Sequence, residues 1–387
     1  MSEWKIYKLG DLGFFFGGVT TISKEDYGHG TPFLPYKNVY KNSKVNVNEL
    51  ELMNVRPQDV EKRSAVYGDI FFTASSETPD EVAMSSVLLD DIENLTFNGF
   101  CKRYRLNNFD TLLPEYARYL FRDVSFRREV YQVATGDIRF NISQESLANI
   151  EIEIPNLATQ SQIAQILTSL DDKIELNLQM NQTLEAMAQA LFKEWFVNFN
   201  FPGFDGKLEN GLPKGWRMGK LGEILELLYG KALKANTRVS GKYLVIGSSG
   251  IVDYHNDFLV EAPGIVIGRK GTIGEVIWID ENFFPIDTTF YVRDLLGVDG
   301  LYFHYFLLKK QEFKKITSDS AVPGLNRNQA MDNVVTIPDI EIIKNFNSII
   351  QPLFLKKEIN STQIQTLTLT RDTLLPKLMS GKIEINI

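Results

Sequence analysis

The sequence predicts an α+β fold in which two similar domains with β-sheet cores are separated by two long helices that form an antiparallel coiled coil. Two observations support this prediction: the chain repeats itself, and each copy ends in a long segment with coiled-coil spacing. At 387 residues the chain is long enough for about two or three domains. We therefore expect an internal pseudo-two-fold repeat, with domains at 1–155 and 206–338 and helical spacers at 156–205 and 339–387.

The repeat is visible at both ends of each half. WKIYKLGDL at 4–12 aligns with WRMGKLGEI at 216–224, so that Trp4 matches Trp216. LANIEIEIPNL at 147–157 aligns with AMDNVVTIPDI at 330–340, so that Pro155 matches Pro338. The separation along the chain between matched residues is smaller for the second pair of aligned segments than for the first. The two halves are therefore expected to share their ends and to diverge in their centres.

Between the matching ends, each half has a globular part rich in strand-forming residues. Short β-branched and aromatic runs such as DIFFTA, GIVIG and EVIWI are bounded by Gly, Asp and Asn, which is typical of strands. Near the end of each part comes a helix candidate, at 114–132 and at 300–316. This mixture of strands and helices predicts an α+β domain in each half.

Each half ends in a segment with the spacing of a coiled-coil seam. Seam positions recur at steps of four and three residues from Leu170 to Trp195, and the matching positions of the second half run from Leu353 to Leu378. Each helix is expected to run for about 40 residues, or about 60 Å, with Pro376 breaking the last turn of the second. One such stripe alone would fit a helix packed on its own domain, but two copies favour a pair. The predicted seam consists of Leu170, Ile174, Asn177, Asn181, Leu184, Leu191, Leu353, Asn360, Ile364, Leu367, Leu374 and Leu378.

Two asparagines occupy matching places in this seam. Asn177 and Asn360 have the same separation along the chain as the matched prolines Pro155 and Pro338. A polar side chain at a seam position costs stability but penalises wrong registers, because its amide would be left unpaired in them. The alternative, in which both amides are partly solvated, stays open. In either case the two helices are interpreted as a spacer of fixed length.

Composition excludes several classes of protein. The formal net charge of −8 argues against binding nucleic acid through bulk positive charge, although a protein that reads bases through a few placed side chains fits. A single cysteine, Cys101, excludes an internal disulfide, and three histidines without cysteine partners predict no metal site. Because no apolar run approaches the ~18 residues that span a bilayer and the first residues lack a signal peptide, we expect a cytoplasmic protein.

The stretch GRKGTIG at 268–274 is the strongest hint of chemistry. Its three glycines around Arg269 and Lys270 resemble a loop that binds phosphate, so one hypothesis is a nucleotide-binding enzyme. However, the stretch leads into a β-like run rather than a helix, and its counterpart FTASSETPDEVAM at 72–84 lacks the glycines and has the opposite charge. A glycine-shaped turn is therefore favoured. A further hypothesis is a coiled-coil scaffold whose globular ends bind protein.

Several segments resemble one known family, the specificity subunits (HsdS) of Type I restriction-modification systems. They are the run from IPNLATQSQIAQ to ALFKEWF at 154–196, GLPKGW at 211–216, VIGRKGTIGEV at 266–276 and RDTLLPKLMSGKIEI at 371–385. The resemblance covers essentially the whole chain, in the order recognition domain, helical region, recognition domain, helical region.

The resemblance implies a DNA-reading function without catalysis. Each recognition domain of such a subunit reads one half of a split, asymmetric double-stranded DNA site through the major groove, and the helices set the separation of the two domains. The helical pair would dock two methyltransferase subunits (HsdM), and two translocase and nuclease subunits (HsdR) would complete the complex. S-adenosylmethionine, ATP and Mg²⁺ are then expected on these partners, and no cofactor on this chain.

Candidate DNA-binding residues are polar side chains in the divergent parts of each half. Arg and Lys pair with guanine, Asn with adenine and hydroxyl groups with several bases, although any one of these residues fits an ordinary solvated loop equally well. In the first half they are Thr20, Thr21, Lys24, Lys37, Asn38, Ser75, Ser76, Arg139 and Asn141. In the second half they are Lys231, Lys234, Arg238, Arg269, Lys270, Thr272, Asn326, Arg327 and Asn328. The loops at 136–141 and 324–328 are the favoured pair, since both precede the strand that leads into a spacer helix.

Overall fold

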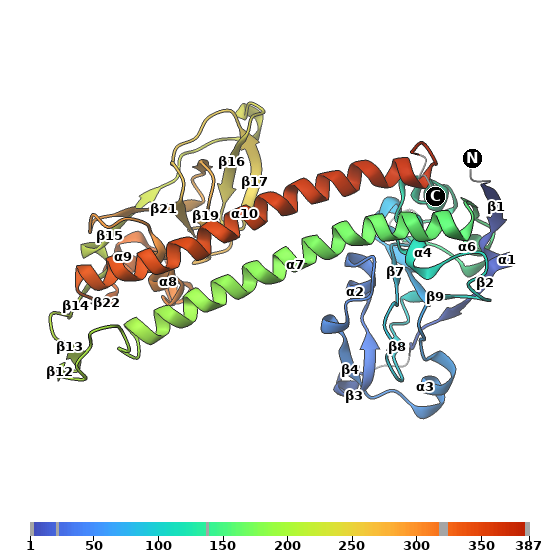
Figure 1. Ribbon diagram of the computed structural model, residues 1–387, viewed down its shortest axis with the longest axis horizontal. Helices are drawn as coiled ribbons and strands as arrows, with labels where there is room; N and C mark the ends of the chain where they lie inside the picture. The colour runs from blue at the N-terminus through green and yellow to red at the C-terminus, as the bar shows by residue number, and fades with distance from the viewer. Residues whose placement is uncertain (1–3, 21–22, 137–138, 317–323, 384–387) are drawn as a thin grey trace. The chain divides into compact units, whose positions relative to one another are not determined.

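The computed structural model describes residues 4–20, 23–136, 139–316 and 324–383. The chain divides into two compact units: unit 1 is Met1–Glu175 with Gln365–Ile387, and unit 2 is Leu176–Ile364. Two long helices, α7 (Leu157–Phe196) and α10 (Ile340–Met379), each begin in one unit and end in the other (Figure 1). Each unit therefore combines one β-rich domain with part of both helices.

Within the described residues, unit 1 contains one four-stranded sheet, one three-stranded sheet and two two-stranded sheets, with short helices around them. Its four-stranded sheet has the order β2-β9-β5-β7, and its three-stranded sheet has the order β4-β3-β8. The strands are β1 (Lys5–Lys8), β2 (Gly13–Gly17), β3 (Tyr27–Leu34), β4 (Glu51–Met53), β5 (Ile70–Thr73), β6 (Ser75–Ser76), β7 (Ser85–Val87), β8 (Thr96–Phe97), β9 (Cys101–Leu106), β10 (Phe140–Asn141) and β11 (Glu151–Ile154). The helices are α1 (Leu9–Leu12), α2 (Tyr36–Lys41), α3 (Pro57–Arg63), α4 (Pro114–Leu120), α5 (Val124–Val133) and α6 (Gln144–Ala148).

The core of unit 1 joins its sheet to both long helices. Phe72 and Tyr104 of the four-stranded sheet pack with Phe121, and the same cluster includes Leu167 of α7 and Leu378 of α10. The start of the domain is fixed by the antiparallel pair β1-β11, which leads directly into α7. Burying such large apolar side chains stabilises the fold by about 1.5–3 kcal/mol each.

Unit 2 repeats this plan. Its sheets have the orders β15-β21-β18-β19 and β17-β16-β20, and β14-β22 leads into α10. The strands are β12 (Leu208–Glu209), β13 (Leu212–Pro213), β14 (Arg217–Lys220), β15 (Leu225–Tyr229), β16 (Tyr243–Gly247), β17 (Gly250–His255), β18 (Gly264–Gly268), β19 (Val276–Ile279), β20 (Phe283–Pro285), β21 (Thr289–Asp294) and β22 (Val334–Ile337). The two short helices are α8 (Tyr302–Lys309) and α9 (Arg327–Met331).

The sheet topology confirms the internal repeat and the α+β fold class. In each unit the four-stranded sheet is wholly antiparallel, whereas the three-stranded sheet has one antiparallel and one parallel pair. Even an isolated parallel bridge recurs, Val19 with Asn98 in unit 1 and Lys231 with Ile286 in unit 2. Val19 and Lys231 have the same separation along the chain as the matched tryptophans of the sequence repeat, at positions 4 and 216.

The long helices run antiparallel, as predicted. Within unit 2 the side chain of Asn177 reaches Gln363, while Asn181, one turn later, reaches Lys357, so residue numbers rise along α7 as they fall along α10. Each helix has 40 residues. Every predicted seam residue is buried or half-buried, and Asn177 and Asn360 are fully buried.

The structure corrects the predicted ends of several helices. Pro376 does not end the second long helix, which continues to Met379 and stops before Gly381, whose φ is +65°. The candidate at 114–132 is two helices, α4 and α5, because Asp123 caps a new helix by accepting a hydrogen bond from the Ser125 amide. The candidate at 300–316 forms the shorter α8 and a separate 3-10 turn. In the described ranges, no helix is long and apolar enough to cross a membrane.

Candidate nucleic-acid interface

One backbone junction occurs at the same place in both units. In unit 1 it lies just after β5, where the Ala74 amide donates to the Phe100 carbonyl at 2.8 Å and the Ala74 carbonyl accepts from the Ile142 amide at 3.1 Å. In unit 2 it lies just after β18, and Arg269 takes the place of Ala74. We call this place the strand-end junction, defined by Ala74 in unit 1 and Arg269 in unit 2.

The unit 2 junction reproduces both hydrogen bonds. Arg269 donates to the Thr288 carbonyl at 2.8 Å, and its carbonyl accepts from the Leu325 amide, also at 2.8 Å. The next residue on each strand also has the same neighbour, since Ser75 pairs with Asn141 and Lys270 with Gly324. Ser75 and Lys270 are therefore equivalent positions with different side chains.

This register corrects the favoured pair of loops. Because Asn141 is equivalent to Gly324, the segment 324–328 corresponds to 141–145 and not to 136–141. Both segments contain a helix cap. Ser143 caps α6 and Asn326 caps α9, each by accepting a hydrogen bond from a backbone amide of that helix. The counterpart of 136–141 is 319–324, most of which lies outside the described residues.

Unit 1 has a cavity beside its junction, of about 400 Å³. It brings together aromatic rings, hydroxyl groups, two carboxylates and one guanidinium group. We call it the Glu81 pocket. It is lined by Tyr36, Tyr40, Ser75, Ser76, Glu77, Glu81, Phe100 and Arg139.

The Glu81 carboxylate is held by hydroxyl donors. Tyr40 donates to its Oε1 at 2.7 Å and Ser76 donates to its Oε2 at 3.0 Å. Hydrogen bonds from Tyr40, Ser76 and Thr78 place the pKa of Glu81 below its ordinary value. The same contact raises the pKa of Tyr40, because its hydroxyl proton bonds a carboxylate. Glu81 is therefore an ionised acceptor of fixed orientation at neutral pH.

Aromatic side chains form the walls of the Glu81 pocket. Tyr36 and Tyr40 lie one turn apart on α2 with parallel rings, 6.2 Å between centroids, and the Tyr36 hydroxyl donates to the Ser75 carbonyl at 2.8 Å. On another side, the Arg139 guanidinium lies 5.9 Å from the Phe100 ring. Phe100 is an exposed large apolar side chain, with 59% of its surface accessible.

In unit 2 the same place is occupied by the GRKGTIG turn. It joins the antiparallel strands β18 and β19, and Gly274 donates to the Gly268 carbonyl at 2.8 Å. A Cβ on Gly268 would lie 2.0 Å from the Thr272 carbonyl oxygen, and Gly274 has a φ of +75°. The Gly268 amide also donates within the turn, to Glu275. The Gly268 and Gly274 amides are used inside the turn, and the turn leads into β19 rather than into a helix. Both observations favour the interpretation as a glycine-shaped turn over a phosphate cradle.

Arg269 and Arg327 both lie close to one aromatic ring in unit 2, that of Tyr229. The guanidinium carbon of Arg269 is 4.9 Å from the centre of the exposed Tyr229 ring, and that of Arg327 is 6.0 Å from it. Arg269 also donates to the Asp287 carbonyl, and Arg327 forms an ion pair with Glu226 at 3.0 Å. Two cations thus gather at the unit 2 junction, where unit 1 has a carboxylate pocket.

The remaining candidates differ in how exposed they are to solvent. Thr21 lies outside the described residues. Lys270 and Asn326 are half-buried. The exposed candidates are Thr20, Lys24, Lys37, Arg139, Asn141, Lys231, Lys234, Thr272 and Asn328.

Several candidates instead hold the fold together. Asn38 is only 1% exposed. Its side-chain amide donates to the Asn46 carbonyl at 2.8 Å, and its side-chain oxygen accepts from the Asn46 backbone amide. Asn38 therefore closes a loop and is not accessible to DNA. Arg238 pairs with Asp253 at 3.0 Å. Ser75 and Ser76 are buried, so Ser76 would act through Glu81 rather than by direct contact.

A family model matches most of the chain. The model for the type I restriction modification DNA specificity domain matches residues 1–186 and 213–369, so both halves match. The chain belongs to this family.

Relatives of the same family are similar over nearly their whole length. The chain is 26% identical to the Type I restriction enzyme MjaIX specificity subunit of Methanocaldococcus jannaschii, covering 99% of this chain and 94% of that one. It is 25% identical to the Type I restriction enzyme HindI specificity subunit of Haemophilus influenzae, covering 99% and 100%. The crystal structure of the S subunit of a type I system from M. genitalium has a similar fold, with a TM-score of 0.63 at 18% identity over 100% of this chain and 97% of that one.

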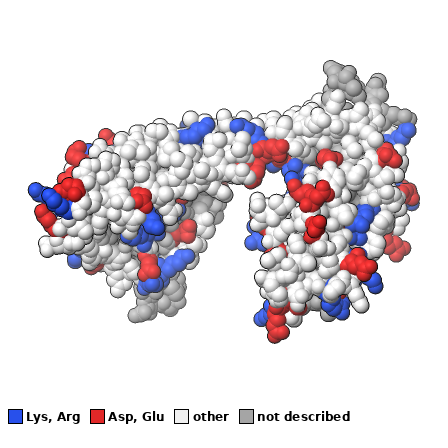
Figure 2. Space-filling model, turned by 60° about the horizontal axis from the view of Figure 1, so that its bottom comes forward, with Lys and Arg blue, Asp and Glu red and all other residues white. Residues whose placement is uncertain are grey.

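The charge of this specificity subunit fits reading by placed side chains. On the face shown in Figure 2, basic and acidic side chains are interspersed over each unit rather than gathered into one basic patch. A continuous positive surface would serve binding to phosphates of any sequence. Interspersed charge, with a net of −8, does not form such a surface and fits recognition by a few placed side chains.

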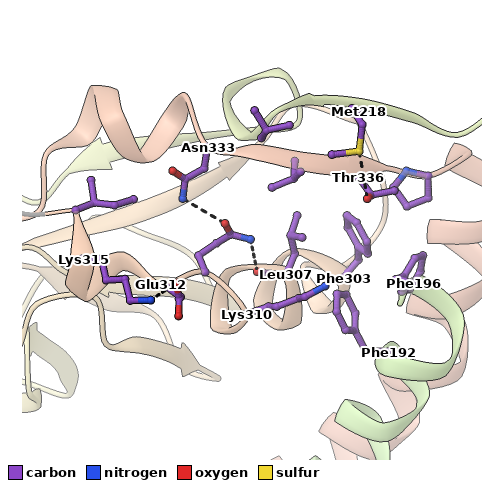
Figure 3. A pocket seen from close by; sticks show the side chains of 15 residues that line it. Phe192, Phe196, Met218, Phe303, Leu307, Lys310, Glu312, Lys315, Asn333 and Thr336 are labelled. Atoms are coloured by element: carbon purple, nitrogen blue, oxygen red, sulfur yellow. Dashed lines mark hydrogen bonds and ion pairs between the residues drawn. The ribbon is translucent and has the colours of Figure 1, made fainter. Parts of the chain in front are cut away.

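A second cavity of about 550 Å³ lies in unit 2. Figure 3 shows Phe192 and Phe196 of α7 beside Phe303 and Leu307 of α8, and Lys310 also lines the cavity. These aromatic side chains belong to the core of unit 2, so the cavity is a gap at the edge of that core.

Sequence reasoning missed the acidic and aromatic members of the Glu81 pocket. It looked for cations, amides and hydroxyl groups, whereas Glu81, Tyr36, Tyr40 and Phe100 were passed over. One signal was available: in YKNVYK two tyrosines are four residues apart, which places them on one face if the segment is helical.

Proposed function

We propose that this specificity subunit recognises an asymmetric, bipartite DNA site, with one half read at each strand-end junction. The observation that supports this is the repetition of the junction with different side chains. Ser75 of unit 1 is replaced by Lys270 of unit 2 at an equivalent backbone position. A duplicated frame with unlike side chains suits two unlike half-sites, since base discrimination depends on donors and acceptors at the groove edge.

The two long helices would set the gap between the half-sites. Both are continuous over 40 residues and pair through a buried seam. A rise of about 1.5 Å per residue makes each helix about 60 Å long. Spacer length in the DNA would then follow from helix length, because each base pair adds about 3.4 Å.

The helices also offer a surface for protein partners. Away from the seam they carry exposed large apolar side chains, including Leu176 and Met187 on α7 and Ile359 and Leu369 on α10. Exposed apolar groups of this kind favour protein contact. We place two methyltransferase subunits on this surface, with two translocase and nuclease subunits completing the complex. Methylation and cleavage would reside in those partners, which would hold S-adenosylmethionine, ATP and Mg²⁺.

Sequencing methylated bases tests this function directly. DNA from cells that contain this chain and its methyltransferase partner is expected to carry methylation in one bipartite, asymmetric motif. Methylation without any sequence preference, or a complex that binds all duplexes equally, would contradict the proposal.

A double substitution at the unit 2 junction separates DNA reading from a scaffold role. Arg269→Ala with Lys270→Ala is expected to relax the motif in one half only, because unit 1 is untouched. The matched control, Lys207→Ala with Lys214→Ala, removes two exposed cations outside the junction and should leave the motif unchanged. Intact methylation with lost assembly in the first variant would instead favour a protein scaffold.

A further inference from the structure

We propose that the Glu81 pocket reads one C·G base pair of the unit 1 half-site, with Glu81 accepting from the cytosine amino group and Arg139 donating to the paired guanine. The inference rests on the proposed function and adds to it a base identity at one position.

The carboxylate has acceptor capacity left. Oε1 accepts from Tyr40, Oε2 accepts from Ser76 and Thr78 supplies a third hydrogen bond, but the two oxygens of an ionised carboxylate together offer about four acceptor sites. The hydroxyl groups that hold it do not neutralise it, so its charge remains available to a donor in the cavity. Because the Glu81 side chain is already held in one orientation, less of its conformational entropy is lost on binding.

A carboxylate on a surface that approaches DNA lowers the affinity for DNA unless it meets a hydrogen-bond donor. Phosphates repel it, so it weakens binding to duplexes in general and favours those that present an amino group. In the major groove cytosine presents only its N4 amino group, whereas adenine presents an amino group beside the N7 acceptor. Since N7 would face a second carboxylate oxygen, cytosine is the better match.

Arg139 supplies the complementary half of the pattern. It lines the same cavity, its side chain is exposed, and Phe100 lies beneath its guanidinium. The guanine partner of cytosine presents two acceptors, O6 and N7, which an arginine fork matches. An acceptor and a donor in one cavity therefore fit the two edges of a single C·G pair.

The connection that carries Glu81 is longer in unit 1 than its counterpart in unit 2. The connection from β5 to β7 covers residues 74–84, eleven residues, whereas the equivalent connection from β18 to β19 covers 269–275, seven residues. The longer connection contains the short 3-10 helix Pro79–Glu81, which carries the carboxylate. The two units would thus read different bases at the same place in their frames.

The test compares Glu81→Gln with Glu61→Gln in the complete complex with its methyltransferase partner. Glu61 is an exposed glutamate of α3 in unit 1 that does not line the pocket, whereas Glu81 accepts from both Tyr40 and Ser76. Glutamine keeps the shape of Glu81 and replaces one acceptor oxygen by a donor amide, which matches adenine. We expect Glu81→Gln to relax one cytosine of one half-site, with adenine newly accepted, and Glu61→Gln to keep the wild-type motif.

Different outcomes contradict different proposals. A wild-type complex without a bipartite motif would overturn the proposed function itself. A wild-type bipartite motif that Glu81→Gln leaves unchanged would overturn only the Glu81 assignment, as would the same relaxation in Glu61→Gln.

A second measurement covers the case in which Glu81→Gln unfolds unit 1 and abolishes methylation. Each cytosine of the half-site is replaced in turn by deoxyribosyl pyrimidin-2-one, which lacks the amino group, and binding of the wild-type complex is measured. One position should lose affinity by roughly five- to 100-fold, the range of one specific base contact. If the complex binds every substituted DNA as tightly as the unmodified DNA, the inference is overturned.

Discussion

The side-chain amide of Asn360 on α10 donates a 2.9 Å hydrogen bond to the amide oxygen of Asn181 on α7. The Asn181 amide in turn reaches the Lys357 carbonyl and the Ser361 hydroxyl, at 3.4 and 3.3 Å. A polar link of this kind, inside a largely apolar seam, penalises other registers of the helix pair.

Removing one partner of this link should cost more than removing both. In Asn360→Leu the Asn181 oxygen loses its donor while it stays in the seam, so unfolding free energy should fall by about 1–3 kcal/mol. Asn181→Leu with Asn360→Leu removes both polar groups and should be nearly neutral or stabilising. Thermal unfolding of the two single variants and the double variant checks this. A double variant as unstable as the sum of the single ones would contradict it.

Glu185 of α7 connects the helix pair to the unit 2 domain. Its carboxylate forms ion pairs with Lys309 of α8, at 2.8 Å, and with Lys357 of α10, and it accepts from the Tyr305 hydroxyl at 2.8 Å. Burial would raise the pKa of Glu185, but Lys309, Lys357 and Tyr305 outweigh it and lower that pKa to about 2.

The low pKa of Glu185 predicts a dependence of stability on acid. A carboxyl group whose pKa is depressed in the folded state contributes stability above its unfolded value, near 4.5, and loses it as the pH falls towards about 2. In Glu185→Gln this contribution is absent, so its melting temperature should fall less steeply between pH 5 and pH 2 than that of the wild type. Glu358→Gln, which changes an exposed glutamate on α10, is the control. Parallel curves for wild type and Glu185→Gln would contradict the assignment.

Gly274 tests the glycine-shaped turn of unit 2. An alanine there would keep a φ of +75° and place its Cβ 2.7 Å from the Cβ of Phe313. Such strain costs on the order of 1–3 kcal/mol, so Gly274→Ala should lower the melting temperature. Gly297→Ala is the control, since Gly297 also has a positive φ, +66°, but a Cβ there meets nothing within 4 Å. Its melting temperature should therefore fall less than that of Gly274→Ala.

The turn hypothesis also predicts no heat of binding when ATP or S-adenosylmethionine is titrated into the wild-type chain, and a clear binding isotherm would contradict it.

The repeat and the helix seam were predictable because they depend on periodicity. Asn177 and Asn360 are separated by the repeat offset, and both are buried as a seam position requires. The Glu81 pocket was not predictable, because Glu81 lies on a connection that the second half shortens by four residues. Arg327 was chosen as an exposed reader, yet its partner Glu226 lies 101 residues earlier, and no local pattern indicates a contact of that range.

The spacer hypothesis makes the last prediction. Residues 172–178 of α7 and 363–369 of α10 each make one heptad, so deleting both restores the seam spacing on each side. The deletion removes the paired Asn177 and Gln363 together, and keeps both the Asn181 to Asn360 link and the Asp171 to Arg371 ion pair. Folding should therefore survive.

Removing seven residues shortens each helix by about 10 Å at 1.5 Å per residue, or about three base pairs at 3.4 Å each. The methylated motif should keep both half-sites and lose about three base pairs from the gap between them, as read by sequencing methylated DNA. Deleting seven residues from α7 alone is the control: it leaves the helices unequal, so the seam cannot pair throughout and methylation should be lost. If the paired deletion folds and methylates with the original gap, the helices do not set the spacing, and the separation of the half-sites must come from the recognition domains or the partner subunits.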